Sequence, residues 1–74
     1  MRRIVVTDWN IGFQKVEFTK TLKAELGYSL SEAKSMTDAV LDGRPVQFDL
    51  HEEQFDRVSG RLNDLGAVFH EEEH

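Results

Sequence analysis

The sequence predicts an α+β fold in which three helices pack on one face of a three-stranded sheet. Strand and helix periodicities follow one another in the order β-α-α-β-α-β, without a linker, a repeat or a low-complexity segment. A helix of about 15 residues separates the last two strands, which suits a parallel crossover between them. Such a crossover leaves a slot for the first strand between the other two.

The first strand is predicted over residues 3–7, because RIVVT is rich in β-branched side chains. The segment DWNIG follows, and its turn-forming residues, beginning with Asp8, are expected to end the strand. Trp9 lies in this segment and Tyr28 lies beyond the following helix. Both aromatic residues are expected to cap the small core rather than to anchor a partner.

The first helix is predicted over residues 14–26, and Gly27 is expected to end it. Its buried stripe falls within about 80° of the helical wheel and consists of Phe18, Leu22 and Leu26. An adjoining arc of about 140° contains Lys15, Val16, Thr19, Lys20 and Lys23. The helix is therefore expected to present lysines along one flank of its buried face.

The second helix is predicted to begin after Ser29, because Glu32 stands three residues later and completes a capping box. Its inner face repeats at three- and four-residue steps: Ala33, Met36, Thr37, Val40 and Leu41. Gly43 and Pro45 are expected to terminate it.

The remaining elements are a strand, a helix and a strand. VQFDL, residues 46–50, alternates apolar and polar side chains and predicts a strand with one buried face. Asp49 or His51 is expected to open the third helix, with Asp49 and Glu52 at capping-box spacing, and Gly66 to end it. Its stripe is Phe55, Val58, Leu62 and Leu65. AVFHE, residues 67–71, predicts the last strand, and residues 72–74 are expected to form a frayed acidic tail.

Composition indicates one small domain over residues 1–74. Cysteine is absent, and no apolar run reaches the length of a signal peptide or a transmembrane helix, so we expect a cytoplasmic protein without a membrane partner. The net charge is −5, which argues against direct nucleic-acid binding. However, residues 1–34 carry +2 and include all four lysines, whereas residues 35–74 carry −7. A basic face on an acidic body suits an acidic protein partner.

No catalytic constellation is evident, and we expect no enzyme activity and no cofactor. No cysteine is present, and the serines serve as helix caps or surface residues. His70 and His74 stand four apart in HEEEH, the spacing of metal ligands on a helix. That segment follows a strand, so a solvated tail is the preferred interpretation and no metal site is expected.

Residues 15–34 contain a motif series that resembles a known family. The series is Lys15-Val16, Lys20, Lys23, Gly27-Tyr28-Ser29-Leu30 and Glu32-Ala33-Lys34. It is similar, without a gap, to the C-terminal globular domain of the bacterial ribosomal stalk protein, which reads Lys-Val, Lys, Arg or Lys, Gly-Leu-Gly-Leu and Glu-Ala-Lys. LNDLGAVFHEE near the end resembles the close of that domain, so the resemblance covers Arg3 to about Glu72.

The resemblance implies a docking surface for translational GTPases on the ribosome. Carried over residue by residue, the partner-binding set is Lys15, Val16, Thr19, Lys20, Lys23 and Lys34. Thr19 departs from the family's usual isoleucine, Ser29 replaces the second turn glycine, and the segment after Lys34 is about two residues longer than the family pattern. These 74 residues do not include the stalk protein's dimerisation domain or hinge, so its anchoring to the ribosome is not carried over.

Two alternatives stay open from the sequence. The same fold is shared with the ClpS-type protease adaptor, which binds N-terminal degron residues, and TDWN offers Asp8 and Asn10 in an altered order. Val40-Leu41-Asp42 has no histidine at the position where that adaptor has one. The other alternative is a structural homodimer that closes through the uncovered face of the sheet.

Overall fold

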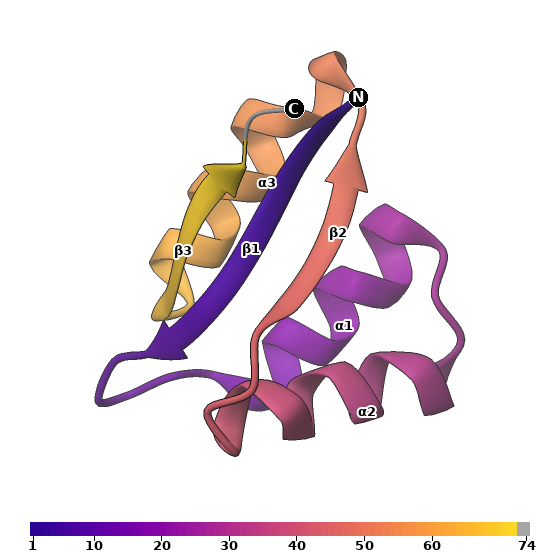
Figure 1. Ribbon diagram of the computed structural model, residues 1–74. Coiled ribbons are helices and arrows are strands. Elements are labelled where there is room, and N and C mark those ends of the chain that lie inside the picture. Colours follow the sequence, from indigo (N-terminus) through magenta and orange to yellow (C-terminus); the bar gives the residue numbers. More distant parts are fainter. Residues whose placement is uncertain (73–74) are drawn as a thin grey trace.

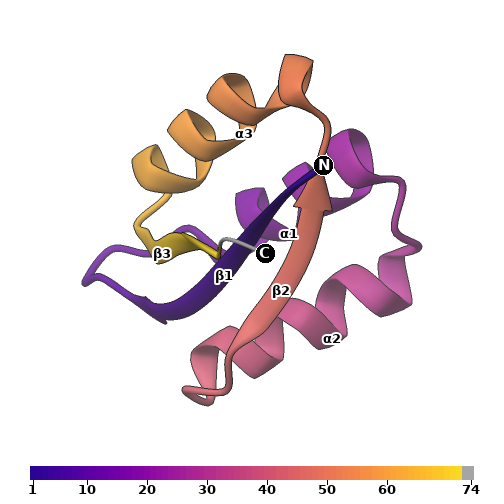
Figure 2. The same cartoon turned by 45° about the horizontal axis from the view of Figure 1, so that its top comes forward.

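The computed structural model describes residues 1–72 and confirms the predicted order of elements. The elements are β1 (Arg2–Trp9), α1 (Lys15–Leu26), α2 (Leu30–Leu41), β2 (Val46–Leu50), α3 (Glu52–Asp64) and β3 (Ala67–Glu72). β1 lies in the centre of the sheet and pairs antiparallel with β2 on one side and β3 on the other. The three helices lie on the same side of the sheet (Figures 1 and 2). β1 therefore lies between β2 and β3, which is the position predicted for the first strand.

The core lies between the sheet and the helices. Alternation along the strands turns one set of side chains inward, and Ile4, Phe48 and Leu50 are almost completely buried. The helices contribute apolar residues at three- and four-residue steps, chiefly Phe18, Leu22, Ala33, Val40, Val58 and Leu62. Leu26, Met36, Leu41 and Phe55, which were also expected to face inward, are only partly buried.

Local signals fix the helix ends. Ser29 and Glu32 form the expected capping box: the Ser29 hydroxyl accepts from the Glu32 N–H at 3.1 Å, and the Glu32 carboxylate accepts from the Ser29 N–H at 3.2 Å. Gly27 follows α1 with φ +72°, a left-handed conformation that glycine adopts without strain. These two features place the start of α2 directly beside the end of α1.

Two boundary predictions were wrong, and of the two residues expected to open α3 only His51 is confirmed. Asp8 lies in β1 rather than in a turn, because a β-bulge at Thr7 lets the strand continue and pair Asp8 with Val68. Asp49 does not open α3: it lies in β2 opposite Arg3, and His51 is the N-cap residue. Glu72 also pairs with Arg3, so it belongs to β3 rather than to a frayed tail. Residues 73–74 lie outside the described residues.

The two aromatic residues near the ends of α1 differ in burial. Tyr28 is partly buried and packs against the core, as expected. Trp9 ends β1, remains 39% exposed, and contacts the ring of Phe13 at a centroid distance of 6.3 Å. No helix within residues 1–72 has the length and apolar character that crossing a membrane requires.

Arg2 connects the start of β1 with the end of β3. Its Nε and Nη2 donate to the two carboxylate oxygens of Glu71 at 2.8 and 2.7 Å, and its guanidinium lies 3.5 Å from the ring centroid of Phe55. The hydrogen bonds from Arg2 lower the pKa of Glu71 below its ordinary value of 4.5. Glu71 is thus a carboxylate whose charged form is favoured by folding.

The replacement Glu71→Gln is expected to make stability less sensitive to acid. Because the folded-state pKa of Glu71 is lowered, its contribution is complete above the ordinary value of 4.5 and is lost as the pH falls through the folded-state pKa. The wild-type protein should therefore exceed the variant in free energy of unfolding near neutral pH, and the difference should shrink below about pH 4.5. Urea denaturation of both proteins at several pH values measures this, and a constant difference would contradict it.

Candidate functional site

The six residues predicted to bind a partner lie on one surface formed by α1 and the first half of α2. A cavity of about 240 Å³ is lined by Val16, Thr19, Lys20, Lys23, Leu30 and Lys34. An adjoining cavity of about 220 Å³ is lined by Lys15, Val16, Thr19, Lys34, Thr37, Asp38 and Leu41. The two cavities share Val16, Thr19 and Lys34. We call the six predicted residues, together with Leu30, the lysine surface.

Two apolar side chains form the centre of the lysine surface. Val16 is 59% exposed and Leu30 is 48% exposed, although each stands at the beginning of a helix whose other large apolar residues are buried or partly buried. Leu30 was missed by the sequence analysis, which assigned the residue only to the turn motif. A leucine outside the buried stripe of an amphipathic helix is the signal that would have found it. Apolar exposure surrounded by polar groups is typical of interaction sites.

Thr19 joins the two helices beneath this surface. Its hydroxyl oxygen lies 2.7 Å from that of Thr37, and each hydroxyl also lies 2.9 Å from the carbonyl oxygen four residues earlier in its own helix. Thr19 and Thr37 therefore form a polar floor between α1 and α2. Because these hydroxyls bond within the chain, the groups offered to a partner are the lysine ammonium groups and the two apolar side chains.

The lysines differ from the arginines in their ion pairs. All five arginines lie within 4.0 Å of a carboxylate of the chain: Arg2, Arg3, Arg44, Arg57 and Arg61. Among the described residues, Lys15, Lys23 and Lys34 have no such partner, whereas Lys20 lies 3.6 Å from Glu17. Asp38 lines one of the two cavities, and the lining of the other contains no acidic residue. The lysine surface therefore keeps a positive excess on a chain of net charge −5.

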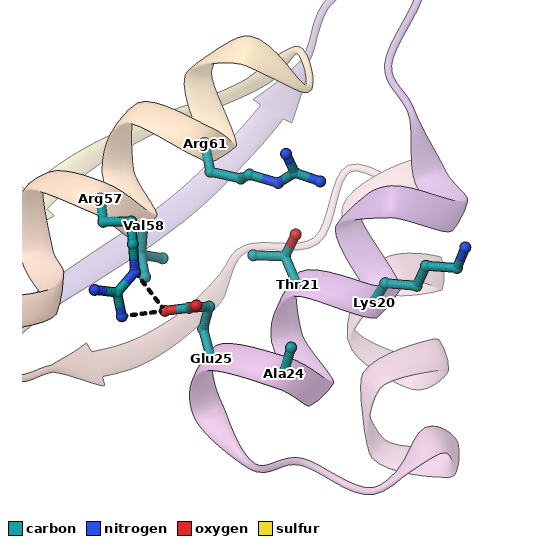
Figure 3. Close-up of a pocket in the computed structure, with 7 residues that line it drawn as sticks. All are labelled: Lys20, Thr21, Ala24, Glu25, Arg57, Val58 and Arg61. Atoms are coloured by element: carbon teal, nitrogen blue, oxygen red, sulfur yellow. Dashed lines mark hydrogen bonds and ion pairs between the residues drawn. The ribbon is translucent and has the colours of Figure 1, made fainter.

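A second groove lies on the other side of α1, between α1 and α3. It has a volume of about 440 Å³ and is lined by Lys20, Thr21, Ala24, Glu25, Arg57, Val58 and Arg61. Figure 3 shows Arg57 and Arg61 extending from α3 towards α1. Arg57 donates from Nε and Nη2 to one oxygen of Glu25, at 3.1 and 2.6 Å, and this hydrogen bonding raises the pKa of the guanidinium above its ordinary value. No pattern in the sequence predicted this groove.

The residues considered for metal binding and peptide capture do not form a comparable site. No group of three or more His, Cys, Asp or Glu side chains within residues 1–72 is arranged to hold a metal ion. His70 lies in β3, and His74 lies outside the described residues. Asp8 accepts a hydrogen bond from the N–H of Trp9 at 2.8 Å, and neither Asp8 nor Asn10 lines any of the three cavities.

The uncovered face of the sheet is polar. Arg3 lies on it, 3.0 Å from Asp49 and 3.8 Å from Glu72. Val5 stands between Gln47 and His70 in the two neighbouring strands and is 8% exposed. A dimer closing through this face would bury charged side chains that already pair within the chain, which is a poor source of association energy.

No family model, curated protein or solved structure matches this chain. The resemblance to the ribosomal stalk domain therefore stays a prediction from the motif series.

Proposed function

We propose that this chain is a non-enzymatic protein-interaction module whose lysine surface docks an acidic helical segment of a partner protein. The observation that carries the proposal is the arrangement of Lys15, Lys23 and Lys34, none of which is ion-paired within residues 1–72, around the exposed side chains of Val16 and Leu30. A molecule with net charge −5 has ten carboxylates available in residues 35–74 alone, yet none neutralises these three lysines among the described residues.

The shape of the surface favours a helix as the occupant. It is a shallow groove between two helices, in which an amphipathic helix can place apolar residues at three- and four-residue steps. Acidic side chains on the flanks of that helix would meet the ammonium groups, and such complementarity accelerates association more than it tightens binding. The small area favours a transient complex with micromolar affinity and a strong dependence on ionic strength.

A translational GTPase is the first partner to test. The motif series in residues 15–34 resembles the stalk domain that docks such factors, and the same residues form the lysine surface. We place this interaction in the cytoplasm, with a protein partner such as a translation factor or the ribosome, rather than with nucleic acid or a membrane.

Charge reversal of Lys15 and Lys23 tests the proposed function. The probes are a purified translational GTPase and a fluorescent peptide of about 15 residues, with leucines on one helical face and glutamates on both flanks. Lys15→Glu/Lys23→Glu should weaken binding of either probe by about tenfold or more, because two attractive contacts become repulsive. Fluorescence anisotropy at low and moderate salt provides the measurement.

Arg44→Glu supplies the matched control for a single Lys23→Glu reversal. Both changes take the net charge from −5 to −7, but Arg44 lies after α2, pairs with Asp42 and lines neither cavity of the lysine surface. Lys23→Glu should weaken binding and Arg44→Glu should leave it nearly unchanged. Equal effects, or no binding of either probe by the wild-type protein, would contradict the proposal. Binding of peptides that begin with Leu, Phe, Trp or Tyr, if lost on Asp8→Ala, would assign the adaptor function instead.

A further inference from the structure

Glu17 stands between two cations that face different grooves. One carboxylate oxygen lies 3.6 Å from Nζ of Lys20, and the other lies 3.3 Å from Nη2 of Arg61. Lys20 lines both the cavity of the lysine surface and the groove between α1 and α3, whereas Arg61 lines only the latter. A single carboxylate of the chain therefore pairs with Lys20, which lines both grooves, and with Arg61, which lines the second.

The Glu17 contacts are looser than those of the neighbouring carboxylate on the same helix. Glu25 receives two hydrogen bonds from Arg57, the shorter at 2.6 Å, and its side chain is 27% exposed. Glu17 holds its two cations at 3.3 and 3.6 Å, and its side chain is 38% exposed. Exposed ion pairs at such distances contribute little to stability, so a carboxylate from outside can replace Glu17 at small cost.

We propose that Glu17 is an internal competitor for the acidic partner, and that the docking surface extends over Lys20 and Arg61 onto α3 when a partner carboxylate takes its place. This inference rests on the proposed function and deepens it, since it concerns the same partner and extends the lysine surface across α1 to the groove on its other side. The footprint would then run from Lys34 on α2 across α1 to Arg61 on α3. Figure 3 shows Lys20 and Arg61 extending from the two helices that border the groove.

Because Glu17 competes with the partner, the wild-type protein should bind the partner more weakly than a protein that lacks this carboxylate. Its binding should also depend less on salt. With Glu17 in place, a partner must first displace a carboxylate before it gains Lys20 and Arg61. Without that carboxylate, both cations are available from the start. More positive charges of the chain then attract the acidic partner, and binding should become more sensitive to ionic strength.

Glu17→Gln tests the inference, with Glu25→Gln as the matched control. Each change removes one carboxylate from α1 and takes the net charge from −5 to −4, but the ion pair of Glu25 is to Arg57 and involves no lysine. In anisotropy titrations with the acidic amphipathic peptide, Glu17→Gln should tighten binding by about twofold to fivefold and steepen its salt dependence. Glu25→Gln should have a clearly smaller effect. Equal effects of the two variants, or weaker binding by Glu17→Gln, would overturn the inference.

Arg61→Gln completes a double-mutant cycle with Glu17→Gln. If Arg61 contacts the partner only when Glu17 releases it, Arg61→Gln should weaken binding more in the Glu17→Gln protein than in the wild type. Strict additivity would overturn the extension onto α3. Failure of the proposed function has a different signature: Lys15→Glu/Lys23→Glu would then bind the peptide as the wild-type protein does.

Discussion

Replacing Phe18 with alanine is expected to lower the free energy of unfolding by about 3–5 kcal/mol. Phe18 is completely buried near the start of α1, and its ring packs against Phe13 at a centroid distance of 5.2 Å. A domain of this size has a total stability of about 5 kcal/mol, so the variant should keep at most about 2 kcal/mol of it. Urea denaturation followed by circular dichroism provides the measurement, and Phe18→Leu, with an expected loss of about 1–2 kcal/mol, keeps the transition measurable.

Val16→Ala on the same helix is the control. Val16 is 59% exposed and lies on the lysine surface, so its truncation should change stability by less than about 0.5 kcal/mol while weakening the binding of the acidic peptide. A loss of stability with Val16→Ala that approached that of Phe18→Ala would show that α1 is rotated relative to the face assigned here. The two variants thus distinguish Phe18, which holds α1 in place, from Val16, which α1 exposes on the lysine surface.

The fold was predictable because each helix and strand carries its own period and its own end signal. Ser29 with Glu32 and Gly27 mark the boundary between α1 and α2 by local chemistry alone. The errors fall where pairing between distant segments decides the outcome. Asp8 favours a turn locally, but the bulge at Thr7 allows it to pair with Val68, sixty residues away in the chain. No local pattern announces that pairing.

The candidate site was predictable to the extent that one helix defines it. The spacing of Lys15, Lys20 and Lys23 places them on one flank of α1 by geometry alone. The rest depends on how the helices pack. The contact between Thr19 and Thr37, and the approach of Arg61 to Glu17, arise because α2 and α3 lie against opposite sides of α1. The periodicity of a helix predicts which of its faces is buried, but it does not predict which other helix packs beside it.

The second large effect is expected at Gly66, the residue immediately before β3. Its φ is +92°, and a β-carbon placed there would lie 3.1 Å from the backbone Cα of Phe13. Gly66→Ala therefore adds a close contact with backbone to the cost of a left-handed conformation, and together these should lower the free energy of unfolding by about 2–4 kcal/mol. The same contact affects the start of α1. Immediately before this helix begins, the N–H of Gln14 donates to the carbonyl of Leu65 at 2.9 Å.

Gly27→Ala separates the two causes. Gly27 has φ +72° and also follows a helix, but a β-carbon there would meet no atom within 4 Å. Gly27→Ala should lower the free energy of unfolding by about 1 kcal/mol, which is the cost of the left-handed conformation alone. The difference between the two variants in urea denaturation then measures the close approach of Gly66 to Phe13. Equal losses of unfolding free energy in the two variants would mean that the segment before α1 moves away from the new methyl group at no cost. The position of Lys15 would then not depend on the turn after α3.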